Sequence, residues 1–149
     1  MAASTETSVG FVDAAVHHRV QQFYAEQMQL LDRGEAEPWA RTFTEDGVFG
    51  TSVDPEPARG RAAIAAGAAE ATARLAADGV VHRHWLGMLH LRPAADGGLH
   101  ARSYALVIRT PKGGEPVVWR SCVCEDLLVP TDGGGWLVRE RHVHRDDLS

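Results

Sequence analysis

The 149-residue sequence has few cysteines, no excess of basic residues and no long apolar run. Fifteen basic residues against twenty acidic ones give a formal charge of −5. This balance leaves no concentrated basic face for nucleic acid. No window approaches the length of apolar sequence that a membrane-spanning helix needs, and the start lacks the basic and apolar regions of a secretory signal. Together these absences predict a cytoplasmic protein that binds neither nucleic acid nor a membrane.

The two cysteines, Cys122 and Cys124, lie two residues apart in an expected strand. Their side chains then point the same way along one chain, which is poor geometry for a disulfide between them, and a C-x-C pair alone is a weak zinc site. We expect reduced, half-buried thiols, with redox or metal use as the alternatives. The sequence also lacks the glycine-rich phosphate loops, the G-x-S-x-G elbow and the H-E-x-x-H motif. We therefore expect no cofactor.

The pattern of apolar residues and turn residues predicts one α+β domain over residues 12–146, after a disordered N-terminus of residues 1–11. Helical spacing predicts a helix from Val12 to Arg33, a short one opening at Pro38 with Trp39 and Phe43 on its apolar side, and a third from Arg61 to Ala77. A short strand is expected over 48–51. Pro/Asp/Gly-rich connections separate four longer strands, so these form an antiparallel meander; we expect them at 80–91, 99–110, 116–129 and 136–143.

This order of elements resembles the nuclear transport factor 2-like superfamily, and within it the SnoaL-like group of polyketide cyclases, scytalone dehydratase and ketosteroid isomerase relatives. The segments that carry the resemblance are 30–34, Trp39, 43–49 and 81–87. The resemblance implies a cone-shaped α+β barrel, with three N-terminal helices packed on a curved antiparallel sheet. It also implies a pocket for a hydrophobic small molecule, and often a homodimer formed through the sheet.

The resemblance further implies a catalytic pair, Asp32 and His84. The dehydratase branch places an aspartate at the end of the first helix and a histidine early in the first long strand, and these two residues match those positions. A carboxylate that accepts from one imidazole nitrogen fixes the tautomer and leaves the other nitrogen free for acid/base work. The alternative is a surface turn aspartate and a histidine with only a structural role. Leu31 and Phe49 stand where the dehydratase has pocket tyrosines, which argues against scytalone-type dehydration.

Strand alternation places four neighbours on the same face as His84, and these are His82, Leu86, Met88 and His90. His82 would flank the pocket mouth and, with Met88, contact substrate. A metal-binding interpretation of His82 and His84 lacks a third ligand at any telling spacing, so no metal site is predicted.

Other strand residues are further candidates for substrate contact. Arg102 and Tyr104 share one strand face, with Ser103 on the other. As donors to a developing oxyanion, Arg102 would bind substrate and Tyr104 would act in catalysis; the alternative is an exposed cross-strand ladder with Arg120 or Glu125. Aromatic rings would line the pocket or pack the core, and the candidates are Trp39, Phe49 and Trp119. Four residues near the C-terminus are expected to be solvated, namely Arg139, Arg141, His142 and His144.

Three functions fit these observations. The first is a cofactor-independent cyclase, isomerase or dehydratase, hence a lyase or isomerase, acting on a polyketide-like molecule in natural-product or antibiotic biosynthesis. The second is a non-catalytic ligand-binding or assembly module like the small subunit of ring-hydroxylating dioxygenases. It would be favoured if Asp32 and His84 did not meet or if side chains filled the pocket. The third, an epoxide hydrolase, needs an aspartate–arginine–aspartate arrangement, for which only Arg102 offers itself.

Overall fold

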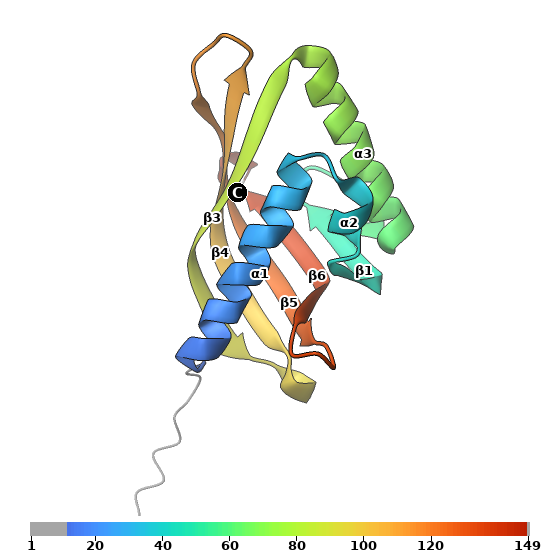
Figure 1. Cartoon of the computed structure of the whole chain (residues 1–149), viewed down its shortest axis with the longest axis vertical. Coiled ribbons are helices and arrows are strands. Elements are labelled where there is room, and N and C mark those ends of the chain that lie inside the picture. The colour runs from blue at the N-terminus through green and yellow to red at the C-terminus, as the bar shows by residue number, and fades with distance from the viewer. Residues whose placement is uncertain (1–11, 149) are drawn as a thin grey trace, which may run out of the picture.

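The computed structural model describes residues 12–148, so the expectation of disorder over residues 1–11 lies outside the described residues. The helices are α1 (Ala14–Asp32), α2 (Ala36–Ala40) and α3 (Arg61–Asp78). The strands are β1 (Phe43–Thr51), β2 (Ala58–Arg59), β3 (Val80–Pro93), β4 (Leu99–Pro111), β5 (Val117–Pro130) and β6 (Trp136–Arg145). Single 3₁₀ turns lie at Ala95–Gly97 and Asp146–Leu148. Figure 1 shows α1 lying across the sheet, with α2 and α3 beside it.

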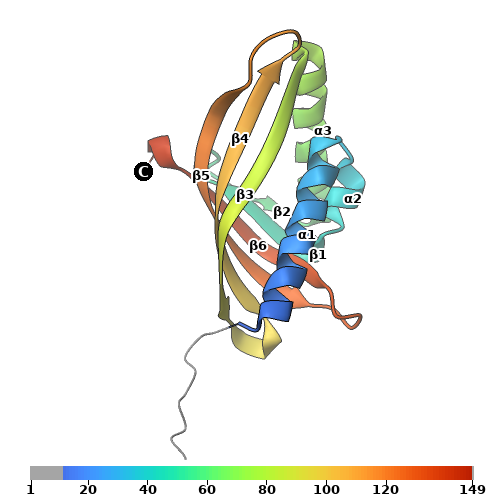
Figure 2. The same ribbon diagram turned by 60° about the vertical axis from the view of Figure 1, so that its left-hand side comes forward.

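The α+β class and the packing of the three helices on a curved sheet are confirmed (Figure 2). The six strands follow the order β2-β1-β6-β5-β4-β3, and β3 to β6 form the expected antiparallel meander. However, β1 pairs with β6 in parallel, so the sheet is mixed. The expectation of a barrel is also wrong, because β2 and β3 lie at opposite edges of the strand order and the sheet stays open.

Helix α1 is fixed at both ends. The Asp13 side chain caps its start by accepting from the backbone N–H of Ala15 at 2.9 Å. At its end the chain reverses through Gly34, whose φ of +76° is a conformation that glycine adopts without strain. This stop leaves Asp32 as the last helical residue, facing the sheet.

The connection into the sheet differs from the expectation. α2 begins at Ala36 rather than at Pro38, and Phe43 starts β1 instead of ending the helix. Phe43 is fully buried, and its ring packs edge-on against Trp39 with centroids 5.1 Å apart. Trp39 also packs against Phe49, with centroids 5.8 Å apart. This aromatic cluster fills the core beside α2 and α3, and the open space described below lies farther along α1.

A β-bulge in β3 decides which residues face the helices. The register against β4 shifts between Gly87 and His90, and Met88 adopts a φ of +54°. Before the bulge the side chains alternate as expected, so His84 and Leu86 face inward. After it, Leu89 is partly buried while Met88 and His90 are exposed. The prediction that Met88 and His90 share the inward face of His84 is therefore wrong.

None of the helices within residues 12–148 is both long and apolar enough to cross a membrane.

Candidate active site

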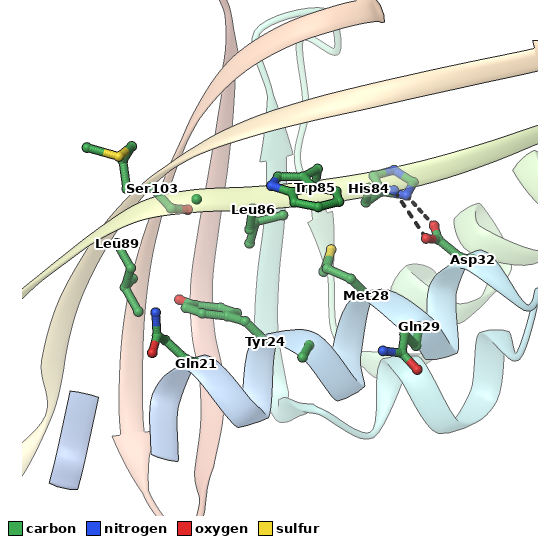
Figure 3. A pocket seen from close by; sticks show the side chains of 13 residues that line it. Gln21, Tyr24, Met28, Gln29, Asp32, His84, Trp85, Leu86, Leu89 and Ser103 are labelled. Carbon is green, nitrogen blue, oxygen red and sulfur yellow. Dashed lines mark hydrogen bonds and ion pairs between the residues drawn. The ribbon is translucent and has the colours of Figure 1, made fainter. Parts of the chain in front are cut away.

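Asp32 and His84 meet where the end of α1 approaches β3 (Figure 3). The Nδ1 atom of His84 lies 2.6 Å from Oδ1 of Asp32, and the backbone N–H of His84 donates to Oδ2 at 3.1 Å. The Asp32 side chain is only 8% exposed and that of His84 is 26% exposed. An ionised carboxylate can only accept, so Nδ1 carries the proton and Nε2 is left with a free lone pair. The pair therefore presents one oriented base.

This pair lines one end of a cavity of about 390 Å³ between α1 and β3. Residues spaced three or four apart on α1 form one wall, because such positions lie on the same helix face. The lining residues are Gln21, Tyr24, Ala25, Met28, Gln29 and Asp32 from α1, His84 to Leu89 from β3, and Ser103 from β4. Figure 3 shows Asp32 and His84 at one end, and Gln21, Tyr24, Leu89 and Ser103 at the other. Apolar side chains such as Met28 and Leu86 occupy the middle, so the cavity suits a ligand with an apolar body.

Behind the second end lies a buried ionic network centred on Asp126 and Arg141. Nε of Arg141 donates to Oδ1 of Asp126 at 2.9 Å, and Nη2 donates to Oδ2 at 2.8 Å. The hydroxyl of Tyr24 donates to the same Oδ2 at 2.6 Å, and Arg141 also donates to Oε1 of Gln27 at 2.7 Å. All four residues are at most 5% exposed. The network thus holds the Tyr24 phenol in one place on the cavity wall.

Burial and charge together keep the groups of this network in fixed protonation states. Burial raises the pKa of Tyr24 well above 10.0, and the neighbouring Asp126 carboxylate raises it further. Burial likewise raises the pKa of the Cys124 thiol, which donates to Oδ1 of Asp126 at 3.5 Å. At neutral pH Tyr24 is therefore a neutral phenol whose hydroxyl proton is used in the hydrogen bond to Asp126.

His82 lies two residues before His84 on the same face of β3, but it does not line the cavity. Its ring packs on that of Trp119 with centroids 4.8 Å apart, and Nη1 of Arg109 lies 3.4 Å from its Nε2. Burial lowers the pKa of His82, and the nearby His84 and Arg109 lower it further. His82 and Trp119 thus form a neutral aromatic pair next to the Asp32–His84 pair.

Among the described residues, no three His, Cys, Asp or Glu side chains gather as a metal site.

Arg102 and Tyr104 do not reach the cavity. Their strand positions alternate with the buried Ala101, Ser103 and Ala105, so they project from the opposite face of the sheet. Arg102 lies 3.7 Å from Glu125 in the exposed cross-strand pair that was the alternative interpretation. The geometry therefore does not support Tyr104 as the partner of His84.

The predicted aromatic contacts are also placed elsewhere. Trp39 and Phe49 pack in the core cluster with Phe43 and do not line the cavity. Met88 does line it, but 78% of the residue is exposed, so it lies at the rim. Of the predicted substrate contacts, Met88 is thus the one that the structure brings to the cavity.

Sequence reasoning missed the buried polar residues. Arg141 was expected to be solvated, yet it is 3% exposed and paired with Asp126. The expectation that only Arg102 could serve an aspartate–arginine arrangement is therefore wrong. Strand alternation held a usable signal, because Asp126 follows Cys122 and Cys124 at a spacing of two and so shares their buried face. A buried carboxylate then requires a cation or several donors.

Comparison with known proteins gives the family of the chain and relatives with the same fold. The family model described as a SnoaL-like domain matches residues 13–142. Aln2 from a Streptomyces species is 33% identical, with a TM-score of 0.85 over 93% of this chain and 96% of that one. A protein from Catenulispora acidiphila, solved in complex with S-DNPA, is 38% identical, with a TM-score of 0.80 over 91% and 96% of the two chains.

A more distant match has the same fold. It is a protein from Novosphingobium aromaticivorans described as the beta subunit of an aromatic-ring-hydroxylating dioxygenase, 19% identical, with a TM-score of 0.70 over 89% of this chain and 90% of that one. No curated protein matches the chain in sequence.

Proposed function

The chain belongs to the SnoaL-like family, and on this premise we propose that it is a cofactor-independent cyclase, isomerase or dehydratase acting on a hydrophobic, polyketide-like small molecule. The observation that carries the proposal is the 2.6 Å contact between Nδ1 of His84 and Oδ1 of Asp32 on the wall of a cavity of about 390 Å³. The relative solved in complex with S-DNPA is 38% identical to this chain, which supports a small-molecule ligand for this chain.

His84 performs the proton transfers. Its Nε2 takes a proton from the carbon next to a substrate carbonyl, and the C–H electron pair moves onto the carbonyl oxygen to give an enolate. Asp32 holds the ring in position and compensates the charge of the imidazolium that forms. The imidazolium then returns the proton, either to another carbon, which isomerises the substrate, or to a departing hydroxyl, which releases water. Both outcomes begin with the same enolate.

The first step can be tested without knowing the substrate. A tricyclic dihydroanthracenone incubated with the protein in D₂O should exchange the hydrogens next to its ketone, which mass spectrometry detects. His84→Ala should abolish the protein-catalysed exchange, whereas Ser121→Ala, which removes a hydroxyl outside the cavity, should leave it unchanged. Exchange at the wild-type rate in a folded His84→Ala variant would refute the role of His84.

The second function, a non-catalytic binding or assembly module, rests on the fold alone, which a dioxygenase beta subunit shares. Two observations favour the enzyme over it, because Asp32 and His84 are hydrogen-bonded and the cavity beside them is open. An assembly module has no need of an oriented base in an open cavity. Binding of the dihydroanthracenone without any exchange would favour the module.

We also propose that the protein forms a homodimer through the face of the sheet that the helices leave uncovered. Large apolar side chains are exposed there, including Tyr104 on β4 (53% exposed) and Val118 on β5 (62% exposed). Exposed large apolar residues of this kind are typical of interfaces. Light scattering should give the mass of two chains, and Val118→Glu should reduce it to one.

A further inference from the structure

Ser103 is a buried polar side chain that faces the cavity. It is 4% exposed, it lines the cavity, and no hydrogen bond joins its hydroxyl to any other side chain or backbone group within residues 12–148. Within the described residues, the fully buried side-chain nitrogen and oxygen atoms without a partner are Nε1 of Trp39 and Nε1 of Trp136, so the Ser103 oxygen still touches the open space of the cavity. A water or a ligand there can supply the hydrogen bond that the protein does not. Ser103 therefore lies at a position where a bound molecule would complete its hydrogen bonding.

Ser103 and Tyr24 both line the cavity, at the end opposite Asp32 and His84 (Figure 3). Ser103 pairs with Cys124 across the β4–β5 ladder, where directly opposite side chains are about 5 Å apart. The thiol of Cys124 and the phenol of Tyr24 both donate to the carboxylate of Asp126. Cys124 and Asp126 thus connect Ser103 on β4 to Tyr24 on α1.

The hydrogen-bonding capacities of these two groups differ. Tyr24 already donates its only hydroxyl proton in a hydrogen bond to Asp126, so toward a ligand its oxygen can only accept. The Ser103 hydroxyl donates to no other group within residues 12–148, so it can donate to a ligand. The nearby cation, Arg141, is occupied by Asp126 and Gln27 and is not available to a carboxylate. One neutral group satisfies this set, a hydroxyl that donates to Tyr24 and accepts from Ser103.

Two independent measures give the distance from this end to the base. Tyr24 and Asp32 are eight residues apart on α1, which is about 12 Å at the helical rise. His84 pairs with Val107, and Ser103 is four residues from Val107 along β4, which is about 13 Å at the strand rise. The intervening wall is largely apolar. The cavity therefore fits an elongated fused-ring molecule.

From these observations we propose that Ser103 and Tyr24 form a specificity site for a phenolic or alcoholic hydroxyl, at the end of a fused-ring substrate opposite to the carbon that His84 deprotonates. The inference deepens the proposed function and rests on it, because His84 defines the reacting end.

Its test uses two linear dihydroanthracenones, one with a phenolic hydroxyl on the ring farthest from the ketone and one without it. Calorimetry of the full chain should give a dissociation constant about 5- to 10-fold lower for the hydroxylated ketone, the effect of one good hydrogen bond. Ser103→Ala and Tyr24→Phe should each remove most of this preference. Ser121→Ala, the matched control on β5, should keep it.

The outcomes separate this inference from the proposed function. His84→Ala should lose hydrogen exchange yet keep the preference for the hydroxylated ketone. If exchange persists in that variant while the preference is intact, the proposed function fails and the hydroxyl site stands. Equal affinity of the wild type for both ketones, no binding of either, or a full preference in a folded Ser103→Ala variant would overturn the hydroxyl site. Thermal melting of each variant establishes that it is folded.

Discussion

The buried pair of Asp126 and Arg141 provides a sharp test of how the fold is held together. Asp126→Asn keeps the shape of the side chain but removes its charge and turns one acceptor oxygen into a donor. The carboxylate now accepts from Arg141 twice and from Tyr24 once, at 2.6–2.9 Å. The variant loses at least one of these bonds and leaves a guanidinium that is 3% exposed without a counter-charge. Breaking a buried pair in this way costs about 3–5 kcal/mol.

Urea unfolding followed by circular dichroism measures this loss of free energy of unfolding. Thermal melting gives a second readout: at about 2–4 °C per kcal/mol for a chain of this size, the melting temperature should fall by about 6–20 °C. Glu35→Gln is the matched control, because Arg33 and Glu35 form an ion pair at 2.6 Å whose side chains are 56% and 44% exposed. That variant should lose less than about 1 kcal/mol. Equal losses in the two variants would refute the reasoning that burial makes the Asp126 pair costly to break.

Three further predictions concern single residues. Asp32→Asn can accept from only one of the two His84 donors, so the hydrogen exchange rate should fall roughly 10²- to 10⁴-fold in a variant that stays folded. In Tyr104→Phe the tyrosinate absorbance reports Tyr24 alone, and Tyr24 should ionise only well above its ordinary pKa of 10.0. Because the pKa is raised in the folded state, the stability that Tyr24 contributes is complete below pH 10 and is lost as the pH rises through the folded-state pKa. Gly34→Ala should cost at least about 1 kcal/mol in urea unfolding, because φ is +76° and the new Cβ would lie 2.6 Å from a methyl group of α3.

The controls for these three lie in the same chain. Gly133→Ala adds a methyl group where nothing lies within 4 Å, so it should leave the free energy of unfolding nearly unchanged. An Asp32→Asn variant with wild-type exchange would contradict the orienting role of the carboxylate. Ionisation of Tyr24 near its ordinary pKa in the folded protein would contradict its burial against Asp126.

Local signals explain why most elements were predictable. The four long strands lie within two residues of their predicted bounds, because Pro/Asp/Gly-rich segments end each one and fix the hairpins. The parallel pairing of β1 with β6 was not predictable in the same way. It joins residues almost a hundred positions apart, and no turn between them specifies its direction. The same lack of a local signal hid the early start of β1 at Phe43.

The candidate site was predictable only in part. The resemblance to the SnoaL-like group brought Asp32 and His84 together, and the structure places them 2.6 Å apart. Arg141 and Asp126 were missed because charged residues are usually exposed, and their burial depends on a partner that is distant in the sequence. The bulge at Met88 was missed because one extra residue leaves no mark in the composition, yet it reverses the faces of all later side chains in β3.

Helix α1 links the two ends of the cavity, and this link gives a reason for the buried ionic network. Tyr24, Met28 and Asp32 are four residues apart and share one face of the helix. Asp32 ties that face to β3 through His84, and Tyr24 ties it to β5 through Asp126. An apolar replacement of the ion pair with similar volume would often be as stable, but it would release Tyr24. The network thus fixes a hydroxyl-accepting oxygen at a set distance from the base, a task that apolar packing cannot perform.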